Sequence, residues 1–188
     1  FTLSCVGDEK NFSHVVSPNY NLADEALSSA LIGLNNVKVY PYLERGSDER
    51  QYCSPGIELP VCGFCRSKYG RYSEYHTSKD NFDVMTQKGI EGSFQVMKNI
   101  IDAFEIGIFP KTLILGEPQL GKRKLYPDIN NQNNIDLEAR NRLNIFAYSN
   151  GRNNIFNIGK KINLPLEKLL LNIKIFKKYK LLKTKYLK

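Results

Sequence analysis

Apolar and polar positions alternate along the first 105 residues in a way that predicts strands and helices in turn. Short apolar stretches with β-branched and aromatic residues predict strands at the start of the chain, over residues 37–43 and over residues 59–65. Apolar positions at helical spacing predict a helix after Asn21, which is a suitable N-cap with Asp24 three residues later. This order of elements is typical of an α/β domain.

A second series of apolar residues at helical spacing predicts a longer helix that is capped by Asp80 and ends near residue 105. Its expected buried face consists of Phe82, Met85, Ile90, Phe94, Met97, Ile101 and Phe104. The strands expected up to this point number about three, fewer than in an average sheet of about five or six. The chain also begins at Phe1 without a methionine. We therefore expect a fragment whose N-terminal strands are missing.

The pattern changes after residue 105. Residues 106–134 are rich in Pro, Gly and Asn and predict a linker. Residues 135–188 then contain three helical segments, the last of which starts at Pro165, and an apolar end that predicts a strand. Three short helices followed by a strand are typical of a helix-turn-helix in a small winged-helix domain.

Charge divides the chain in the same way. The formal net charge is +8, and residues 151–188 carry Arg152 and ten lysines against one acid, Glu167. The basic segment is consistent with a polyanionic partner such as nucleic acid or an anionic membrane surface, and equally with a solvated lysine-rich helix. Hydrophobic residues make up 41% and charged residues 24%, as in a soluble globular protein. The sequence has no apolar run of about 18 residues and opens on no signal peptide.

The cysteines are Cys5, Cys53, Cys62 and Cys65, and the last two form the motif CGFC. This spacing occurs in half of a zinc site and in redox pairs. No second CxxC motif and no histidine at zinc-finger spacing accompany it, and it lies inside an apolar stretch that reads as a strand. We expect structural cysteines, kept reduced in a cytoplasmic protein.

Two polar segments, ERGSDERQYCSPG and EYHTSKDN, carry the most specific signal. Together with CVGDEKNFS and EPQLGKRKLYP, they resemble a bacterial aminopeptidase-like family that is often labelled as polysaccharide-biosynthesis proteins. That family belongs to the zinc-dependent aminopeptidases with two co-catalytic metals. The wider group has an SD loop, a strand and an HT…D loop before its last helix. Here these are Ser47-Asp48 and His76-Thr77…Asp80.

The resemblance covers nearly all of residues 1–185 and implies a fold and an activity. The expected fold is the C-terminal portion of a zinc-aminopeptidase-type three-layer sandwich, over residues 1–105, followed by a winged helix. The expected activity is hydrolysis of a peptide or amide bond with two zinc ions, linked to polysaccharide biosynthesis. His76 matches the last metal-ligand histidine, and Asp8 matches a carboxylate ligand after a central strand. His14, Cys62 and Cys65 match no functional position.

The remaining metal ligands and the glutamate base lie upstream in the family, so this chain alone is not expected to hold a complete site. The dense polar loop supplies four candidate substrate-binding residues, Arg45, Ser47, Asp48 and Arg50, where an arginine would hold an anionic group. The same loop is also consistent with a salt-bridged surface loop.

The runner-up function is a winged-helix protein that binds nucleic acid or acts as a regulator, with a vestigial α/β domain. Its contacts would be lysines of the third helix, which enters the major groove in such domains. These are Lys168, Lys174, Lys177 and Lys178. Asn172 is the only obvious residue for reading a base edge.

Overall fold

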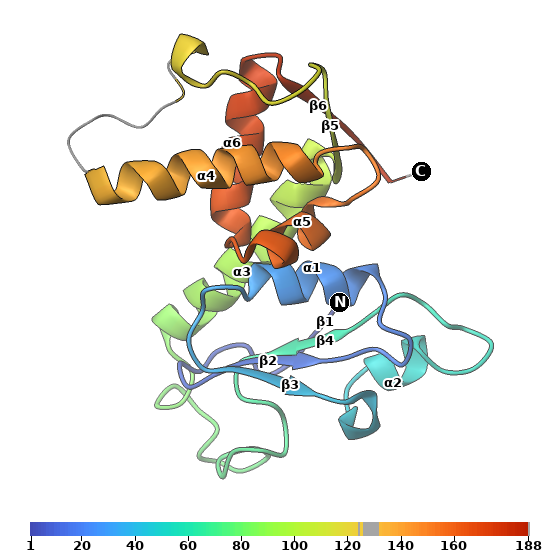
Figure 1. Cartoon of the computed structure of the whole chain (residues 1–188). Coiled ribbons are helices and arrows are strands. Elements are labelled where there is room, and N and C mark those ends of the chain that lie inside the picture. The colour runs from blue at the N-terminus through green and yellow to red at the C-terminus, as the bar shows by residue number, and fades with distance from the viewer. Residues whose placement is uncertain (124, 126–131, 188) are drawn as a thin grey trace. The chain divides into compact units, whose positions relative to one another are not determined.

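The computed structural model describes residues 1–123, 125 and 132–187, with no account of the side chains of 132–136 (Figure 1). The chain divides into two compact units, Phe1–Ile100 and Ile101–Lys188. The first is a mixed α/β unit. The second contains three helices and a pair of strands. Within the described residues, no helix is both long and apolar enough to span a bilayer.

A mixed sheet of four strands forms the centre of the first unit. The strands lie in the order β1-β4-β2-β3, with bounds Thr2–Leu3 (β1), Gly63–Cys65 (β4), Phe12–Val15 (β2) and Val37–Tyr40 (β3). β1 is parallel to β4 and β2 is parallel to β3, whereas β2 is antiparallel to β4. The carboxyl ends of β1 and β4 therefore meet at one end of the sheet, and those of β2 and β3 meet at the other.

Helix α1 (Leu22–Ala30) covers one face of this sheet, and its predicted start is confirmed. The Asn21 side chain accepts a hydrogen bond from the backbone N–H of Ala23, and Asp24 accepts one from the backbone N–H of Asn21. These reciprocal bonds satisfy N–H groups that a helix start leaves unpaired. The buried residues of α1 include Ala23, Ala26 and Leu27, which belong to the predicted apolar face.

The segment from η1 (Tyr42–Glu44) to α2 (Glu49–Tyr52) runs over the opposite face. Thr2 projects from this face and donates a hydrogen bond to Glu49 (3.1 Å), while the Ser4 and Ser47 hydroxyls lie 2.7 Å apart. Residues that pair in register project to the same face. His14 and Phe64 pair in this way and lie on the α1 side.

Helix α3 (Gln87–Ile106) starts six residues later than a helix capped by Asp80 would. Asp80 does not cap it, but accepts a hydrogen bond from the Tyr72 hydroxyl (2.9 Å). The predicted buried face is also wrong, because Ile90, Phe94 and Ile101 are 48%, 66% and 55% exposed. The buried residues are Gly89, Ser93, Val96, Ile100, Ala103 and Ile106. At Gly89 the lack of a side chain lets the helix backbone approach the backbone of Gly7.

The second unit has the predicted series of three helices and a final strand. These are α4 (Gln132–Tyr148), α5 (Ile155–Ile162), α6 (Leu166–Lys178) and β6 (Leu182–Lys185). Phe146 packs on Phe176 and Phe104 on Phe156, with ring centroids 4.3 and 5.4 Å apart. α5 ends at Asn163, whose left-handed backbone turns the chain into α6. α5 and α6 therefore form the helix-turn-helix.

The stretch predicted as a linker, residues 106–134, contains regular structure. It includes β5 (Phe109–Thr112), which pairs antiparallel with β6, and η2 (Gly121–Arg123). The Pro and Gly content led to the linker prediction, but the pairing of β5 with a strand some seventy positions later is not visible in local sequence. Residues 124 and 126–131 of this stretch lie outside the described residues.

Candidate functional site

Asp8 lies just beyond the carboxyl end of β1 and is buried. Its Oδ2 accepts a hydrogen bond from the backbone N–H of Ser67 (2.7 Å), and its Oδ1 accepts bonds from the Ser67 hydroxyl (2.9 Å) and the Lys10 N–H (2.8 Å). A carboxylate offers about four acceptor positions. One position on Oδ2 therefore remains for a further ligand, and the three bonds hold the group in one orientation.

His76 lies in the loop that follows β4. Its backbone is in the left-handed region, with φ of 59°, and its ring stacks on Tyr75 with centroids 4.0 Å apart. The side chain is exposed, and among the described residues it makes no hydrogen bond or ion pair. Both ring nitrogens are thus available as ligands.

The tertiary structure places these two segments at the same end of the sheet, because β1 and β4 are adjacent and parallel. Lys10 Nζ lies 3.6 Å from Glu74 Oε1, which links the Asp8 segment to the His76 loop. Cys5 lies close to both segments. Its pKa is raised mainly by burial, lowered by a hydrogen bond with Tyr72 and raised again by the charges of Asp80 and Asp8. Carboxylate oxygen and imidazole nitrogen are both zinc ligands, so Asp8 and His76 each offer a donor atom of a kind that zinc binds.

A second group with metal-ligand chemistry was not predicted. His14, Asp24 and Cys62 each supply one possible metal-ligand atom, and these three atoms lie within 4.8 Å of one another. All three residues are buried. By distance alone, this group can hold a metal ion. The sequence of β2, FSHV, has no alternation of apolar and polar residues, and Ser13, His14 and Val15 are all buried, so local pattern did not indicate that His14 lies in the interior.

Hydrogen bonding gives the same group a structural role. Asp24 Oδ1 lies 2.8 Å from His14 Nε2 and accepts from the Ser17 N–H (3.0 Å), while Oδ2 accepts from the Ser17 hydroxyl and the Asn21 N–H (2.8 Å). All four acceptor positions are thus used. Burial raises the pKa of the Cys62 thiol, which favours its protonated form. Metal binding here would have to displace these bonds and deprotonate the thiol.

The two cysteines of CGFC do not act as a pair. Cys62 lies beside Asp24 on the α1 side of the sheet. Residues three apart along an extended chain project to opposite faces, so Cys65 lies on the other side. Burial raises the pKa of Cys65 to about 12. This arrangement supports the expectation that these cysteines are structural.

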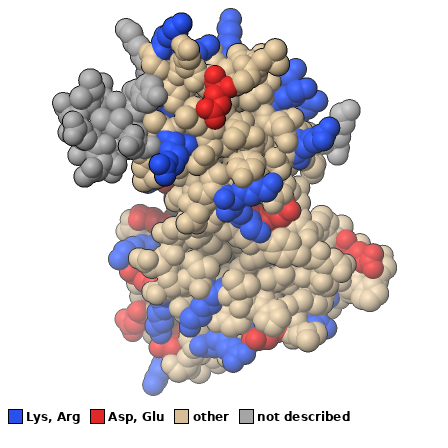
Figure 2. Space-filling model, in the orientation of Figure 1, with Lys and Arg blue, Asp and Glu red and all other residues tan. Residues whose placement is uncertain are grey.

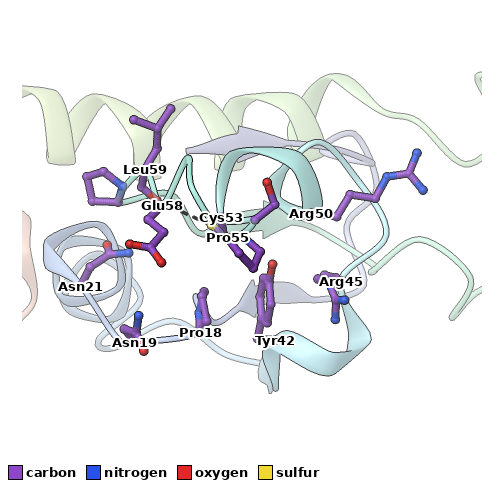
Figure 3. A pocket seen from close by; sticks show the side chains of 12 residues that line it. Pro18, Asn19, Asn21, Tyr42, Arg45, Arg50, Cys53, Pro55, Glu58 and Leu59 are labelled. Atoms are coloured by element: carbon purple, nitrogen blue, oxygen red, sulfur yellow. Dashed lines mark hydrogen bonds between the residues drawn. The ribbon is translucent and has the colours of Figure 1, made fainter.

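The four predicted substrate-binding residues do not form one cluster. The Ser47 hydroxyl lies beside Ser4, at the carboxyl end of β1, and the Asp48 side chain makes no capping bond to α2. Arg45 and Arg50 instead line a pocket of about 480 Å³ next to residues that follow β2 and β3 (Figure 3). The local sequence does not show this division, because the loop crosses a whole face of the sheet.

Glu49 anchors this loop and was not predicted. The buried carboxylate accepts hydrogen bonds from the Tyr69 hydroxyl (2.5 Å), the Gly46 N–H (3.0 Å) and the Thr2 hydroxyl (3.1 Å). Burial acts to raise its pKa, but the bonds from Tyr69, Gly46 and Ser47 outweigh burial and lower it. The loop is therefore held by a buried carboxylate.

The four lysines of α6 divide into two groups. The side chains of Lys168, Lys174 and Lys178 are exposed and make no hydrogen bond or ion pair within the described residues. Lys177 Nζ donates to the Ile106 carbonyl (3.2 Å) and the Thr184 hydroxyl (3.0 Å). Asn172 is buried, accepts a bond from Arg142 Nε (3.1 Å) and donates to the Lys168 carbonyl (2.9 Å), so the expectation that it reads a base is wrong.

Comparisons with known proteins identify both units. Residues 1–107, more than half of the chain, match a family model described as a domain of unknown function, DUF4910. The chain belongs to this family. Residues 108–184 match a winged helix-turn-helix model, which confirms the prediction for the second unit.

One relative, from Clostridium acetobutylicum, bears the name "Putative polysaccharide biosynthesis protein with aminopeptidase-like domain". This DUF4910 chain is 30% identical to it over 174 residues, which cover 88% of this chain and 39% of the relative. A crystal structure described as a "putative peptidase" from the same organism matches with a TM-score of 0.76 and 27% identity. The match covers 96% of this chain and 40% of that one, so the chain spans about two fifths of either relative's length.

These matches confirm the predicted resemblance to aminopeptidase-like polysaccharide-biosynthesis proteins. They also confirm the coarse architecture, a mixed α/β domain followed by a winged helix.

Proposed function

We propose that this chain forms part of a zinc-dependent, aminopeptidase-like hydrolase that cleaves a peptide or amide bond. The observation that carries the proposal is the position of Asp8 and the His76 loop at the shared carboxyl end of β1 and β4. Ligands that follow adjacent parallel strands converge without any distortion of the sheet. The names of the two relatives support the reaction class.

Asp8 and His76 would hold zinc, and the remaining ligands and the glutamate base would come from outside these 188 residues. Zinc, when bound, polarises the scissile carbonyl and lowers the pKa of a bound water. Ser67 would keep the Asp8 carboxylate oriented through its N–H and its hydroxyl. This support is the kind that outer partners give to metal ligands.

Ser47 and Asp48 would face the substrate, since Ser47 lies beside Ser4 at the same end of the sheet. The substrate would be a peptide or an amide-bearing intermediate of cell-surface polysaccharide synthesis, in line with the name of the longer relative. The reaction would take place at the end of the sheet where β1 and β4 end.

The zinc content of the protein expressed from its complete reading frame tests this proposal. We expect His76→Ala to lose about half of the bound zinc, because one ion of a pair loses a ligand. Cys62→Ala is the matched control, since it removes a donor from the buried His14–Asp24–Cys62 group and should leave the zinc content unchanged.

Replacement of zinc by cobalt separates the two groups independently of activity. Cobalt bound by Asp8 and His76 has no sulfur ligand and should show no thiolate charge-transfer band. Unchanged zinc in His76→Ala, or a thiolate band that disappears in Cys62→Ala, would remove Asp8 and His76 from the metal site.

A second candidate function is nucleic-acid binding by the winged helix, supported by the exposed lysines on α6 and the match to a winged helix-turn-helix model. Figure 2 shows basic side chains scattered singly over the visible face of the second unit. Scattered lysines without a base-reading partner would contact phosphates without regard to base sequence.

We expect each of Lys168→Gln, Lys174→Gln and Lys178→Gln to lower the slope of log affinity against log salt concentration by about 1. Fluorescence anisotropy with a labelled DNA duplex measures this slope. Lys177→Gln removes the same charge from the same helix at a side chain that already bonds Ile106 and Thr184, and should change the slope least. Equal slopes in all four variants would exclude this surface.

A further inference from the structure

The pocket lined by Arg45 and Arg50 lies at the opposite end of the sheet from Asp8 and His76. It is lined by Pro18, Asn19 and Asn21, which follow β2, and by Tyr42, which follows β3. Asp8, in contrast, precedes β2, and β2 is antiparallel to β4. The pocket has a volume of about 480 Å³, which is within the range of small-ligand pockets. It lies where β2 and β3 end, and the carboxyl ends of parallel strands are common positions for ligands.

Three charged side chains line this pocket. Among the described residues, Arg45, Arg50 and Glu58 make no side-chain hydrogen bond and no ion pair. The Arg45 guanidinium lies 4.5 Å from the centre of the Tyr42 ring, which orients it and leaves its N–H groups free at the edge.

The opposite charges lie at different sides of the pocket. Figure 3 shows Glu58 near Asn19 and Asn21 and Arg45 on the far side of Tyr42, while the Arg50 side chain points away from the other labelled residues. A ligand with one positive and one negative end would satisfy both.

The backbone around the pocket is held in place before any ligand binds. Glu58 has a left-handed backbone, with φ of 48°. Two hydrogen bonds hold it: the Glu58 N–H donates to the Ser54 carbonyl (3.1 Å), and the Leu59 N–H donates to the Tyr52 carbonyl (2.8 Å). Pro18, Pro55 and Pro60 restrict the lining further and supply apolar surface together with Leu59. An uncommon backbone conformation held by its surroundings is often a feature of ligand sites.

We infer that this pocket is a separate binding site for a short peptide with free termini. Arg45 would bind the carboxylate, Glu58 would bind the terminal ammonium, and the prolines, Leu59 and the Tyr42 ring would contact the peptide between them. The inference does not depend on the proposed metal site, because the two lie at opposite ends of β2.

Titration of the full chain with three probes tests this, using isothermal calorimetry or NMR shifts of the lining residues. The probes are trialanine, N-acetyl-trialanine and trialanine amide. We expect trialanine to bind with millimolar affinity, and each modified probe to bind about tenfold more weakly, since each loses a hydrogen bond between charged groups.

Variants assign each end of the ligand. Arg45→Gln should weaken trialanine binding about tenfold but have little further effect on the amide. Glu58→Gln should bind trialanine and N-acetyl-trialanine with the same affinity. Lys38→Gln, an equal charge change on an exposed residue of β3, should bind trialanine like the unmodified chain.

Several outcomes would overturn the inference. These are no saturable binding of trialanine, equal affinity for the three probes, or the same affinity in Arg45→Gln as in Lys38→Gln. His76→Ala should bind trialanine normally, so loss of the metal site and loss of this pocket give different results.

Discussion

Gly89→Ala is expected to destabilise the first unit by about 3 kcal/mol or more. A Cβ at Gly89 would lie 1.9 Å from the Gly7 carbonyl oxygen and 2.7 Å from the Asp8 carbonyl oxygen. Both atoms belong to the backbone, so the helix must move away from the segment that carries Asp8. The intrinsic gain of about 1 kcal/mol for Ala over Gly in a helix is too small to offset this. Urea unfolding measures the loss, and amide hydrogen exchange in β2 and β4 locates it.

Gly92→Ala is the matched control, because it adds the same atom one turn later in α3. Its Cβ would meet Arg66 Nη1 at 2.5 Å, which is a side-chain atom and not the backbone, although Arg66 would lose part of its bonding to the Asn11 and Gly89 carbonyls if it moved. We expect a smaller loss than in Gly89→Ala. If Gly89→Ala were as stable as Gly92→Ala, the close packing of α3 on Gly7 would be wrong.

Asp24→Asn is expected to lower the free energy of unfolding by about 3–5 kcal/mol at neutral pH, because it breaks a buried, hydrogen-bonded pair. Asp24 lies 2.8 Å from His14 and also accepts bonds from Ser17 and Asn21. An amide can accept at only one of the two oxygen positions, so donors that now face the carboxylate would be left unpaired. Thermal or urea unfolding of the purified chain measures the change.

The effect of pH on Asp24 has a definite sign. Burial acts to raise the Asp24 pKa, but the bonds from His14, Ser17 and Asn21 outweigh burial and lower it. A carboxyl group whose pKa falls on folding stabilises the protein above its unfolded pKa of about 4. That contribution disappears as the pH falls through the lower, folded value. The stability difference between the unmodified chain and Asp24→Asn should therefore shrink below about pH 4.

Asp83→Asn is the control for this experiment, since Asp83 is exposed and undergoes the same chemical change. We expect it to alter stability by less than about 0.5 kcal/mol at any pH. A stability difference between the unmodified chain and Asp24→Asn that does not depend on pH would contradict the assigned role of the Asp24 carboxylate.

Local sequence determined the elements whose stabilising contacts are close along the chain. The start of α1 was predictable because Asn21 and Asp24 bond to each other's backbone across three residues. The winged helix was predictable because apolar residues recur at helical spacing in both α5 and α6, and only a short turn separates the two helices. The site residues Asp8 and His76 were identified only through their resemblance to a family, since neither has a local pattern of its own.

Contacts between distant residues decided the rest. The buried face of α3 includes Gly89, where the helix approaches the backbone of Gly7, and leaves exposed the large apolar residues Ile90, Phe94 and Ile101 that helical spacing predicted to be buried. The His14–Asp24 pair and the division of the polar loop between Ser4 and the Arg45–Arg50 pocket likewise arise where separate elements meet. Sequence periodicity records which side of an element is apolar. Only packing in three dimensions decides which side another element covers and which polar groups then face one another.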